Sequence, residues 1–155
     1  MKGLRYVYKS KRSFCIAWAF FLPVLAHAES STHFYSAEEK DVPFSSAVQV
    51  DTILYLSGVI GIDKNGHLPD GFGDQTRNVM NNIAELLRKS GADFSDVFRC
   101  SVAVTDVKNI PEFNRIYLSH FSQGHYPVRM VYGVSALALG ASVEVQCDAH
   151  HNVKK

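Results

Sequence analysis

Acidic residues are missing from the first 28 positions of the chain, which carry five lysines and arginines before the first carboxylate at Glu29. The 155-residue chain as a whole is balanced, with 16 basic and 15 acidic side chains. Without its basic head, residues 29–155 hold 11 basic and 15 acidic side chains, a net charge of −4. Such a body is a poor electrostatic match for nucleic acid, so no nucleic-acid partner is predicted.

Cysteine is also scarce, with only Cys15, Cys100 and Cys147 in the chain. Neither a Cys-x-x-Cys nor a His-x-x-x-His spacing occurs, so we predict no metal and no cofactor. Cys100 and Cys147 fall in two expected strands, where an oxidising compartment would allow a disulfide. Half-buried strand cysteines are more often small hydrophobic residues, and this is the interpretation we favour over the bridge.

Long hydrophobic runs are absent too. The longest is the thirteen-residue stretch Phe14–Ala26, which is too short to cross a bilayer of ~30 Å as a helix. Basic residues precede it, and Ala26-His27-Ala28 follows as a small-x-small cleavage pattern. We therefore predict a signal peptide over 1–28 and a periplasmic or secreted protein of residues 29–155, with no stable membrane insertion after signal removal. An uncleaved single-span anchor is the alternative.

The remaining composition, 46% hydrophobic and 20% charged, is that of one globular domain. Residues 29–43 are polar and are expected to be a lead-in without a strand. The elements expected after it are a β-hairpin over 48–57, a helix over 75–90 capped by Asp74, a strand over 97–105, a helix opened by Asn109, and strands over 128–134 and 142–147. This order predicts an α+β domain with a mixed sheet and two helices on one face. The other face stays bare in one chain, which favours self-association.

Two charged residues lie in strands that are otherwise apolar, Arg129 and Glu144. If the last two strands form a hairpin closed over 135–141, the two residues are cross-strand neighbours on one sheet face. A charge in such a strand is costly to bury unless it is paired or meets a ligand. The pair is then either a structural ion pair or a clamp, in which Arg129 grips a small carboxylate with two donors and Glu144 acts as acid or base beside it.

The chain resembles the RidA (YjgF) family of reactive-intermediate deaminases over about 43–149. The segments that carry the resemblance are Pro43–Val48, Leu56–Gly61, Gln75–Arg77, Asn81–Ile83, Val104–Asp106, Phe113–Tyr117, Pro127–Arg129 and Val143–Val145. The resemblance implies a chorismate-mutase-like fold and a homotrimer with three ligand clefts between subunits. It also implies cofactor-free hydrolysis of 2-imino acids or their enamines, such as 2-aminoacrylate and 2-iminopropanoate, to 2-keto acids and ammonia.

The family's site residues fall on matching positions of this sequence. The resemblance makes Arg129 the arginine that grips the substrate carboxylate and Glu144 the glutamate that orients the attacking water. The further substrate-binding positions that it implies are Phe44, Ser57, Gly58, Asn114 and Val131. The chain departs from the family in two places: Phe44 stands where many deaminating members have tyrosine, and Val59 replaces glutamine in the usual Ser-Gly-Gln.

Three functions are compatible with these observations in different degrees. The first is an imine deaminase that acts on a small-molecule imino acid. The alternative is a non-catalytic trimeric binder of small carboxylate metabolites, which the loss of polar groups at Phe44 and Val59 favours. The third is a ribonuclease or translation inhibitor, a role that some family members carry by name. The net charge of −4 and the export signal both argue against this third function.

Overall fold

The structure of the chain, a computed structural model, describes residues 30–37 and 42–151. The expected signal peptide therefore lies outside the described residues. The elements are β1 (Thr32–Ser36), β2 (Ser45–Val50), β3 (Ile53–Leu56), β4 (Val59–Ile60), α1 (Phe72–Lys89), β5 (Val97–Val104), α2 (Ile110–Leu118), β6 (Val128–Gly133) and β7 (Val143–His150), with short 3₁₀ turns at Phe94–Asp96, Val107–Asn109 and Ala138–Gly140. In the part of the chain described, no helix is long and apolar enough to span a membrane.

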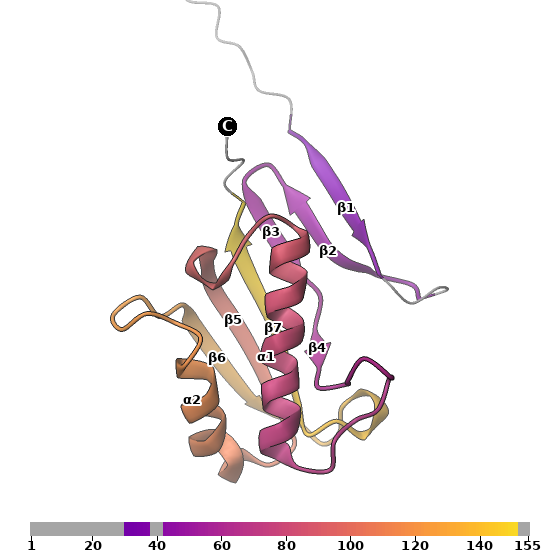
Figure 1. The fold of residues 1–155 in the computed structure, drawn as a ribbon, viewed down its shortest axis with the longest axis vertical. Helices are drawn as coiled ribbons and strands as arrows, with labels where there is room; N and C mark the ends of the chain where they lie inside the picture. The colour runs from indigo at the N-terminus through magenta and orange to yellow at the C-terminus, as the bar shows by residue number, and fades with distance from the viewer. Residues whose placement is uncertain (1–29, 38–41, 152–155) are drawn as a thin grey trace, which may run out of the picture.

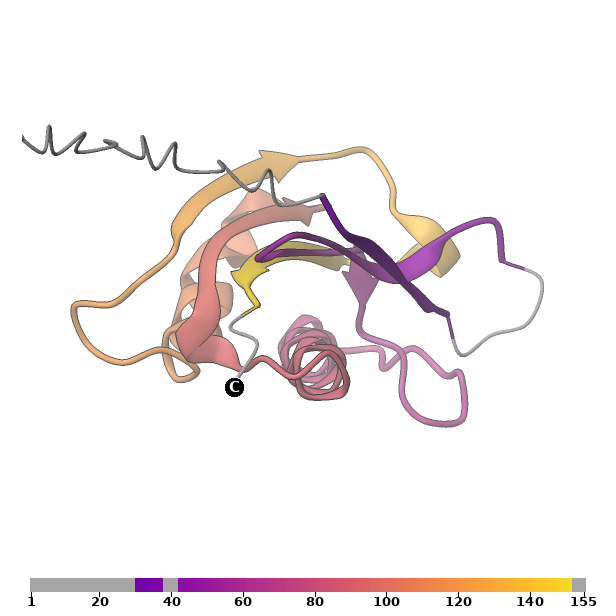
Figure 2. The ribbon, with the colours of Figure 1, turned by 90° about the horizontal axis from the view of Figure 1, so that it is seen from above.

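A single mixed sheet forms the centre of the domain, in the order β1-β2-β3-β7-β5-β6, with β4 pairing on β7. All neighbouring strands are antiparallel except β5 and β6, which are joined through α2 and run parallel. Both helices lie on one side of the sheet, and the sheet curves around α1 (Figures 1 and 2). The predicted α+β architecture, with a mixed sheet and two helices on one face, is confirmed.

The hydrophobic core lies between the sheet and the two helices. From β5, alternate residues Cys100, Val102 and Val104 point into it and are at most 1% exposed, as their spacing predicts. The helices contribute the apolar stripes Val79, Met80, Ile83 and Leu87 from α1 and Phe113, Ile116 and Tyr117 from α2. Alternation along strands and helical spacing along helices thus place one apolar surface of each element in the same core.

The start of α1 and the structure of the polar lead-in differ from the sequence prediction. Helix α1 begins at Phe72 with Gly71 as its N-cap, so Asp74 lies in the first turn, where it pairs with Arg77 instead of capping the helix. A carboxylate is favourable in either place, because the first turn carries the positive end of the helix dipole. The polar lead-in contains strand β1, which pairs antiparallel with β2 and adds an edge to the sheet. The side chains of β1 are mostly exposed, so the strand needs no alternation of apolar residues and gives no strand pattern in the sequence.

The expected hairpin between the last two strands does not form. Strand β5 lies between them: Cys100 is opposite Arg129 on β6 and opposite Cys147 on β7. The reason is topological, because a strand that follows a helix crossover pairs parallel with the strand before the helix. β6 therefore takes one edge of β5, and β7 takes the other. Equal spacing of two strands from a turn does not show that they pair with each other, because an earlier strand of the chain can lie between them.

Cys100 and Cys147 are bonded as a disulfide, so the favoured interpretation of two separate hydrophobic residues is wrong. The two residues are direct cross-strand partners on the core face of β5 and β7, with Cα atoms 4.1 Å apart. Both are at most 1% exposed. The bridge closes a sequence separation of 47 residues between the two central strands of the sheet.

The sheet face opposite the helices is uncovered in the single chain and carries exposed apolar side chains on its outer strands, with polar side chains of β5 and β7 between them. The register places Val128, Met130 and Tyr132 of β6 on this face, where they are 67%, 56% and 49% exposed. Phe34 of β1 and Tyr55 of β3 are a second exposed apolar group on the same face. Exposed apolar side chains gathered on one face are typical of a protein contact, and self-association through this face stays a prediction.

Candidate functional site

Arg129 lies on edge strand β6 and points to the helix side of the sheet, in register with Cys100. Its guanidinium carbon lies 4.9 Å from the ring centroid of Tyr117 and 5.6 Å from that of Phe113. Both distances are within the range of a cation–π contact. Within 30–37 and 42–151, no carboxylate forms an ion pair with Arg129. The guanidinium is therefore stacked on two rings, with its charge available to an anion.

The helix beside Arg129 carries two unsatisfied polar atoms. Asn114 Oδ1 and Tyr117 Oη are buried and have no hydrogen-bond partner among the described residues. Burial raises the pKa of Tyr117 to about 12, although the charge of Arg129 acts in the opposite direction, so its hydroxyl stays protonated at neutral pH. Val131, two residues after Arg129, is half-buried and packs on the core from the same face. Arg129, Asn114 and Val131 thus belong to one half-site at β6 and α2, called here the arginine half-site.

Glu144 lies near the start of β7, on the side of β5 away from β6. It is paired with Ile60 of β4. Its carboxylate rests against Gly58, where a Cβ would overlap Oε1. The Ser57 hydroxyl donates to the carbonyl oxygen of Ser45 at 2.7 Å, which places the start of β2 and the exposed Phe44 beside it. Four predicted site residues therefore meet here, Glu144, Gly58, Ser57 and Phe44, and form what we call the glutamate half-site.

The two half-sites do not meet within one chain. Along β5, Arg129 is level with Cys100 and Glu144 with Ala103, and their side chains point to opposite faces of the sheet. Two strand spacings of ~4.8 Å and three residues of ~3.3 Å put the two Cα atoms roughly 14 Å apart. The expectation that they share one sheet face is wrong, and the structural ion pair between them does not exist in the chain.

Sequence analysis missed the role of the aromatic pair under Arg129. Phe113 and Tyr117 lie on the apolar face of α2 and are buried, at 0% and 2% exposed. Their rings stack on each other with centroids 5.4 Å apart. Two aromatic residues at i,i+4 before a strand with a lone arginine are a signal for such a contact, but it becomes visible only once the crossover places β6 beside α2.

Val59 stands at the glutamine position of the Ser-Gly-Gln segment, but its side chain faces the core and does not lie beside Glu144. It pairs with Val145 on β7 and packs against the core. Its neighbour Ile60 is the residue level with Glu144. Val59 therefore lies on the core face of the sheet, whereas Glu144 points to the opposite face.

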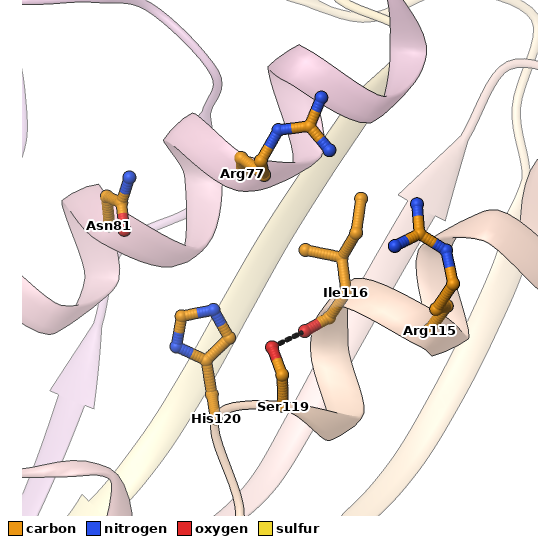
Figure 3. A pocket seen from close by; sticks show the side chains of 6 residues that line it. All are labelled: Arg77, Asn81, Arg115, Ile116, Ser119 and His120. Atoms are coloured by element: carbon orange, nitrogen blue, oxygen red, sulfur yellow. Dashed lines mark hydrogen bonds between the residues drawn. The ribbon is translucent and has the colours of Figure 1, made fainter.

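A groove of about 320 Å³ lies between α1 and α2 (Figure 3). It is lined by Arg77, Asn81, Arg115, Ile116, Ser119 and His120. Arg77 is bound to Asp74 at 2.6 Å, and the Ser119 hydroxyl donates to a backbone carbonyl. Burial lowers the pKa of His120, so its ring is neutral at pH 7. The groove holds none of the predicted site residues.

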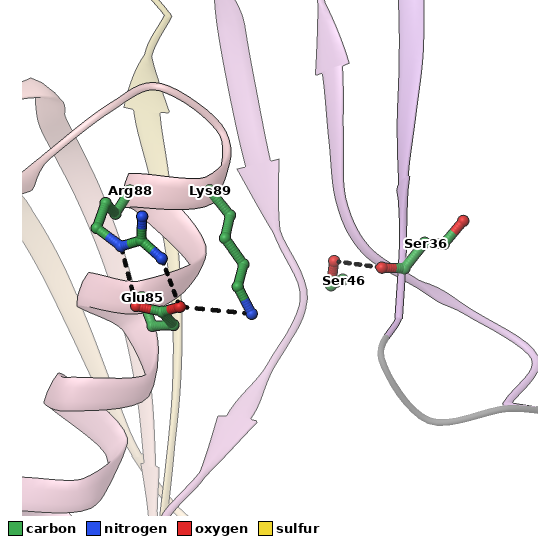
Figure 4. A network of polar contacts seen from close by, with 5 residues as sticks. All are labelled: Ser36, Ser46, Glu85, Arg88 and Lys89. Carbon is green, nitrogen blue, oxygen red and sulfur yellow. Dashed lines mark hydrogen bonds and ion pairs between the residues drawn. The ribbon is translucent and has the colours of Figure 1, made fainter.

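A network of charged side chains lies on the exposed surface of α1 (Figure 4). Glu85 accepts two hydrogen bonds from Arg88, at 2.7 and 3.1 Å, and lies 3.5 Å from Lys89. The hydrogen bonds from Arg88 lower the pKa of Glu85. Exposed pairs of this kind contribute little stability and carry no chemistry. Nor does any group of three or more His, Cys, Asp or Glu in the described ranges lie close enough to hold a metal ion.

Comparison with known proteins gives a consistent result at the level of sequence. Residues 36–151 match the family described as Endoribonuclease L-PSP. The mouse 2-iminobutanoate/2-iminopropanoate deaminase is 38% identical over 109 residues, which cover 69% of this chain and 80% of the mouse protein. The chloroplastic Reactive Intermediate Deaminase A of Arabidopsis thaliana is 34% identical over 109 residues, 69% of this chain and 58% of the plant protein.

Solved structures agree with the sequence matches. RidA from the Antarctic bacterium Psychrobacter sp. has a TM-score of 0.69 at 29% identity, covering 74% of this chain and 94% of that one. Yeast Mmf1 also has a TM-score of 0.69, at 25% identity, with 81% and 98% covered. The family match spans well over half of the chain, and the fold is shared along nearly the whole length of these structures. The chain therefore belongs to the RidA (YjgF) family, the family described as Endoribonuclease L-PSP.

Proposed function

We propose that this protein hydrolyses 2-imino acids, and the enamines in equilibrium with them, to 2-keto acids and ammonia. Water adds to the imine carbon and forms the new C–O bond. The C–N bond then breaks, ammonia leaves, and the keto acid remains, with no net oxidation or reduction. Since the imine carbon is already electrophilic, the protein has to supply only orientation, a water-poor cleft and a positioned water.

The observation that carries this proposal is the state of Arg129. Its guanidinium is stacked on two buried rings and is not neutralised by any described carboxylate. A planar fork of donors held in this way fits the carboxylate of a small imino acid. The relatives named deaminases, at 34–38% identity, support the same substrate class. Glu144 would take a proton from the attacking water as it adds to the imine carbon and return it to the nitrogen, which leaves as ammonia once it also has the hydroxyl proton of the adduct.

We further propose that the reaction takes place between two copies of the chain in a homotrimer. One small imino acid cannot touch Arg129 and Glu144 of the same chain, because the two side chains leave opposite faces of the sheet roughly 14 Å apart. A second copy packed on the exposed apolar face of β6 would bring its glutamate half-site toward this arginine half-site. A closed ring of such heterologous contacts gives each cleft one half-site from each of two subunits.

The alternative is a non-catalytic binder of small carboxylates, which Phe44 favours. This residue is 58% exposed beside Ser57 and has no hydroxyl to offer a substrate. Such a binder would keep the arginine half-site and lack turnover. A nucleic-acid function fits less well, since residues 29–155 carry a net charge of −4.

The experiment that separates these functions uses imino acids generated in situ by an amino-acid oxidase. We expect the mature protein to accelerate keto-acid and ammonia release and to bind pyruvate, the keto-acid product of 2-iminopropanoate, in calorimetry. Pyruvate binding without acceleration would favour the binder over the deaminase. Absence of both would contradict the carboxylate site itself. If the protein still cleaves RNA after rigorous repurification, the result would favour the nuclease function.

We also propose export to the periplasm or the outside of the cell, with removal of residues 1–28. The cationic and apolar head supports it, and so does the buried Cys100–Cys147 disulfide, a bond typical of oxidising compartments. We expect mass spectrometry of the exported protein to find a chain beginning at Glu29 with no free thiol under denaturing, non-reducing conditions, because Cys15 leaves with the signal. A start upstream of Ala26, or two reactive thiols, would contradict this proposal.

A further inference from the structure

The two rings under Arg129 form a continuous aromatic surface on α2. Phe113 and Tyr117 stack with an interplanar angle of 27°, and Phe121 packs on the far side of Tyr117 with centroids 4.7 Å apart. Tyr117 is 2% exposed and Phe113 is fully buried. The surface is therefore fixed by its packing in the core, whereas Arg129 reaches it from an exposed position on an edge strand.

This contact constrains the guanidinium without consuming its donors. A cation–π contact uses the face of the planar group and the electron-rich face of the ring. The five N–H donors lie in the plane of the guanidinium and remain available at its edge. An ion pair with a carboxylate would have the opposite effect, since it would occupy those donors and compete with a ligand.

We propose that Tyr117, with Phe113 beside it, is a positioning residue that orients Arg129 for a substrate carboxylate. The inference rests on the proposed function, because it assigns a cause to the anion grip of the same site. An arginine on an edge strand has several rotamers, and a ligand that fixes one of them loses affinity through the lost side-chain entropy. A ring that selects the binding-competent rotamer beforehand removes part of this loss, so Tyr117 acts on affinity and not on the chemical step.

The plain alternative is that Tyr117 only fills the core. Both roles predict a loss of stability when the ring is removed, so a thermal midpoint cannot distinguish them. They differ in the affinity for an anion and in the division of the effect between KM and kcat. The hydroxyl allows a clean comparison, because Tyr117 Oη has no hydrogen-bond partner among the described residues. Tyr117→Phe therefore keeps the ring and removes no described hydrogen bond.

The test compares Tyr117→Leu, Tyr117→Phe and the control Phe121→Leu in the mature protein. Phe121 packs on Tyr117 and on the core, but no contact with Arg129 is described for it. Removing a cation–π contact of the usual strength should weaken pyruvate binding by Tyr117→Leu about three- to thirtyfold. The KM for the imino acid should rise by a similar factor, with kcat within about twofold of the parent. Tyr117→Phe should retain the pyruvate affinity of the parent.

The control separates positioning from packing. We expect Phe121→Leu to lower the thermal midpoint as Tyr117→Leu does, with pyruvate affinity within about twofold of the parent. Parental affinity in Tyr117→Leu, or an equal loss in Phe121→Leu, would overturn the positioning role and leave the proposed function intact. A parent protein that binds no pyruvate would instead contradict the proposed function, and the inference with it.

Discussion

Glu144→Gln is expected to lower kcat for imine hydrolysis by about 10²–10⁴-fold while pyruvate affinity stays near the parental value. The amide is close in size to the carboxylate, but it cannot accept the proton of the attacking water. Arg129 forms no ion pair with Glu144 within one chain, and in the proposed shared cleft it binds the substrate carboxylate while Glu144 acts on the water, so the anion grip should be retained. Since the uncatalysed hydrolysis is itself fast, the rate must be measured at a protein concentration at which the parent exceeds background by a wide margin.

A matched control for this variant is Glu85→Gln, which alters an exposed glutamate on α1 that pairs with Arg88 and Lys89 of the same helix. It should leave turnover unchanged. Three readouts belong together for Glu144→Gln: thermal midpoint, pyruvate affinity and hydrolysis. A large fall in midpoint with tighter pyruvate binding and unchanged turnover would contradict the catalytic role. It would show that Glu144 neutralises Arg129 across the subunit contact.

Local patterns in the sequence predict the layers of this fold well. Alternation in β5 places Cys100, Val102 and Val104 in the core, and the apolar stripe of α1 faces them, because side-chain periodicity depends only on local geometry. Gly91 follows α1 with φ of +77°, as expected of a glycine at a helix C-terminus. Strand β1 was missed, since an edge strand with exposed side chains needs no apolar alternation.

Non-local pairing is the part that local patterns do not determine. The last two strands looked like a hairpin from their spacing, yet β5 separates them, and this single error displaced Arg129 from Glu144. The same insertion brings Cys100 opposite Cys147 and makes the disulfide possible. The identity of the site residues came from the resemblance to the family, while their division into two half-sites could not be derived without the strand order.

If each cleft takes Arg129 from one subunit and Glu144 from another, two inactive variants should recover hydrolytic activity when they assemble into the same trimer. Arg129→Ala keeps the glutamate half-site, and Glu144→Gln keeps the arginine half-site. A trimer assembled from both chains has some clefts with both native residues. For random assembly at equal amounts, half of the clefts have a native arginine and half of those a native glutamate, so about one quarter are complete.

The most direct measurement is therefore hydrolysis by the two variants coexpressed with different affinity tags and purified through both tags, with light scattering to check that the assembly is a trimer. We expect each variant alone to be nearly inactive and the doubly purified trimer to recover about one third of parental activity, because the second tag removes trimers of one chain and every ring that holds both chains has one complete cleft among its three. A mixed assembly as inactive as its components would contradict a cleft shared between subunits. A stable monomer at micromolar concentration would contradict it as well.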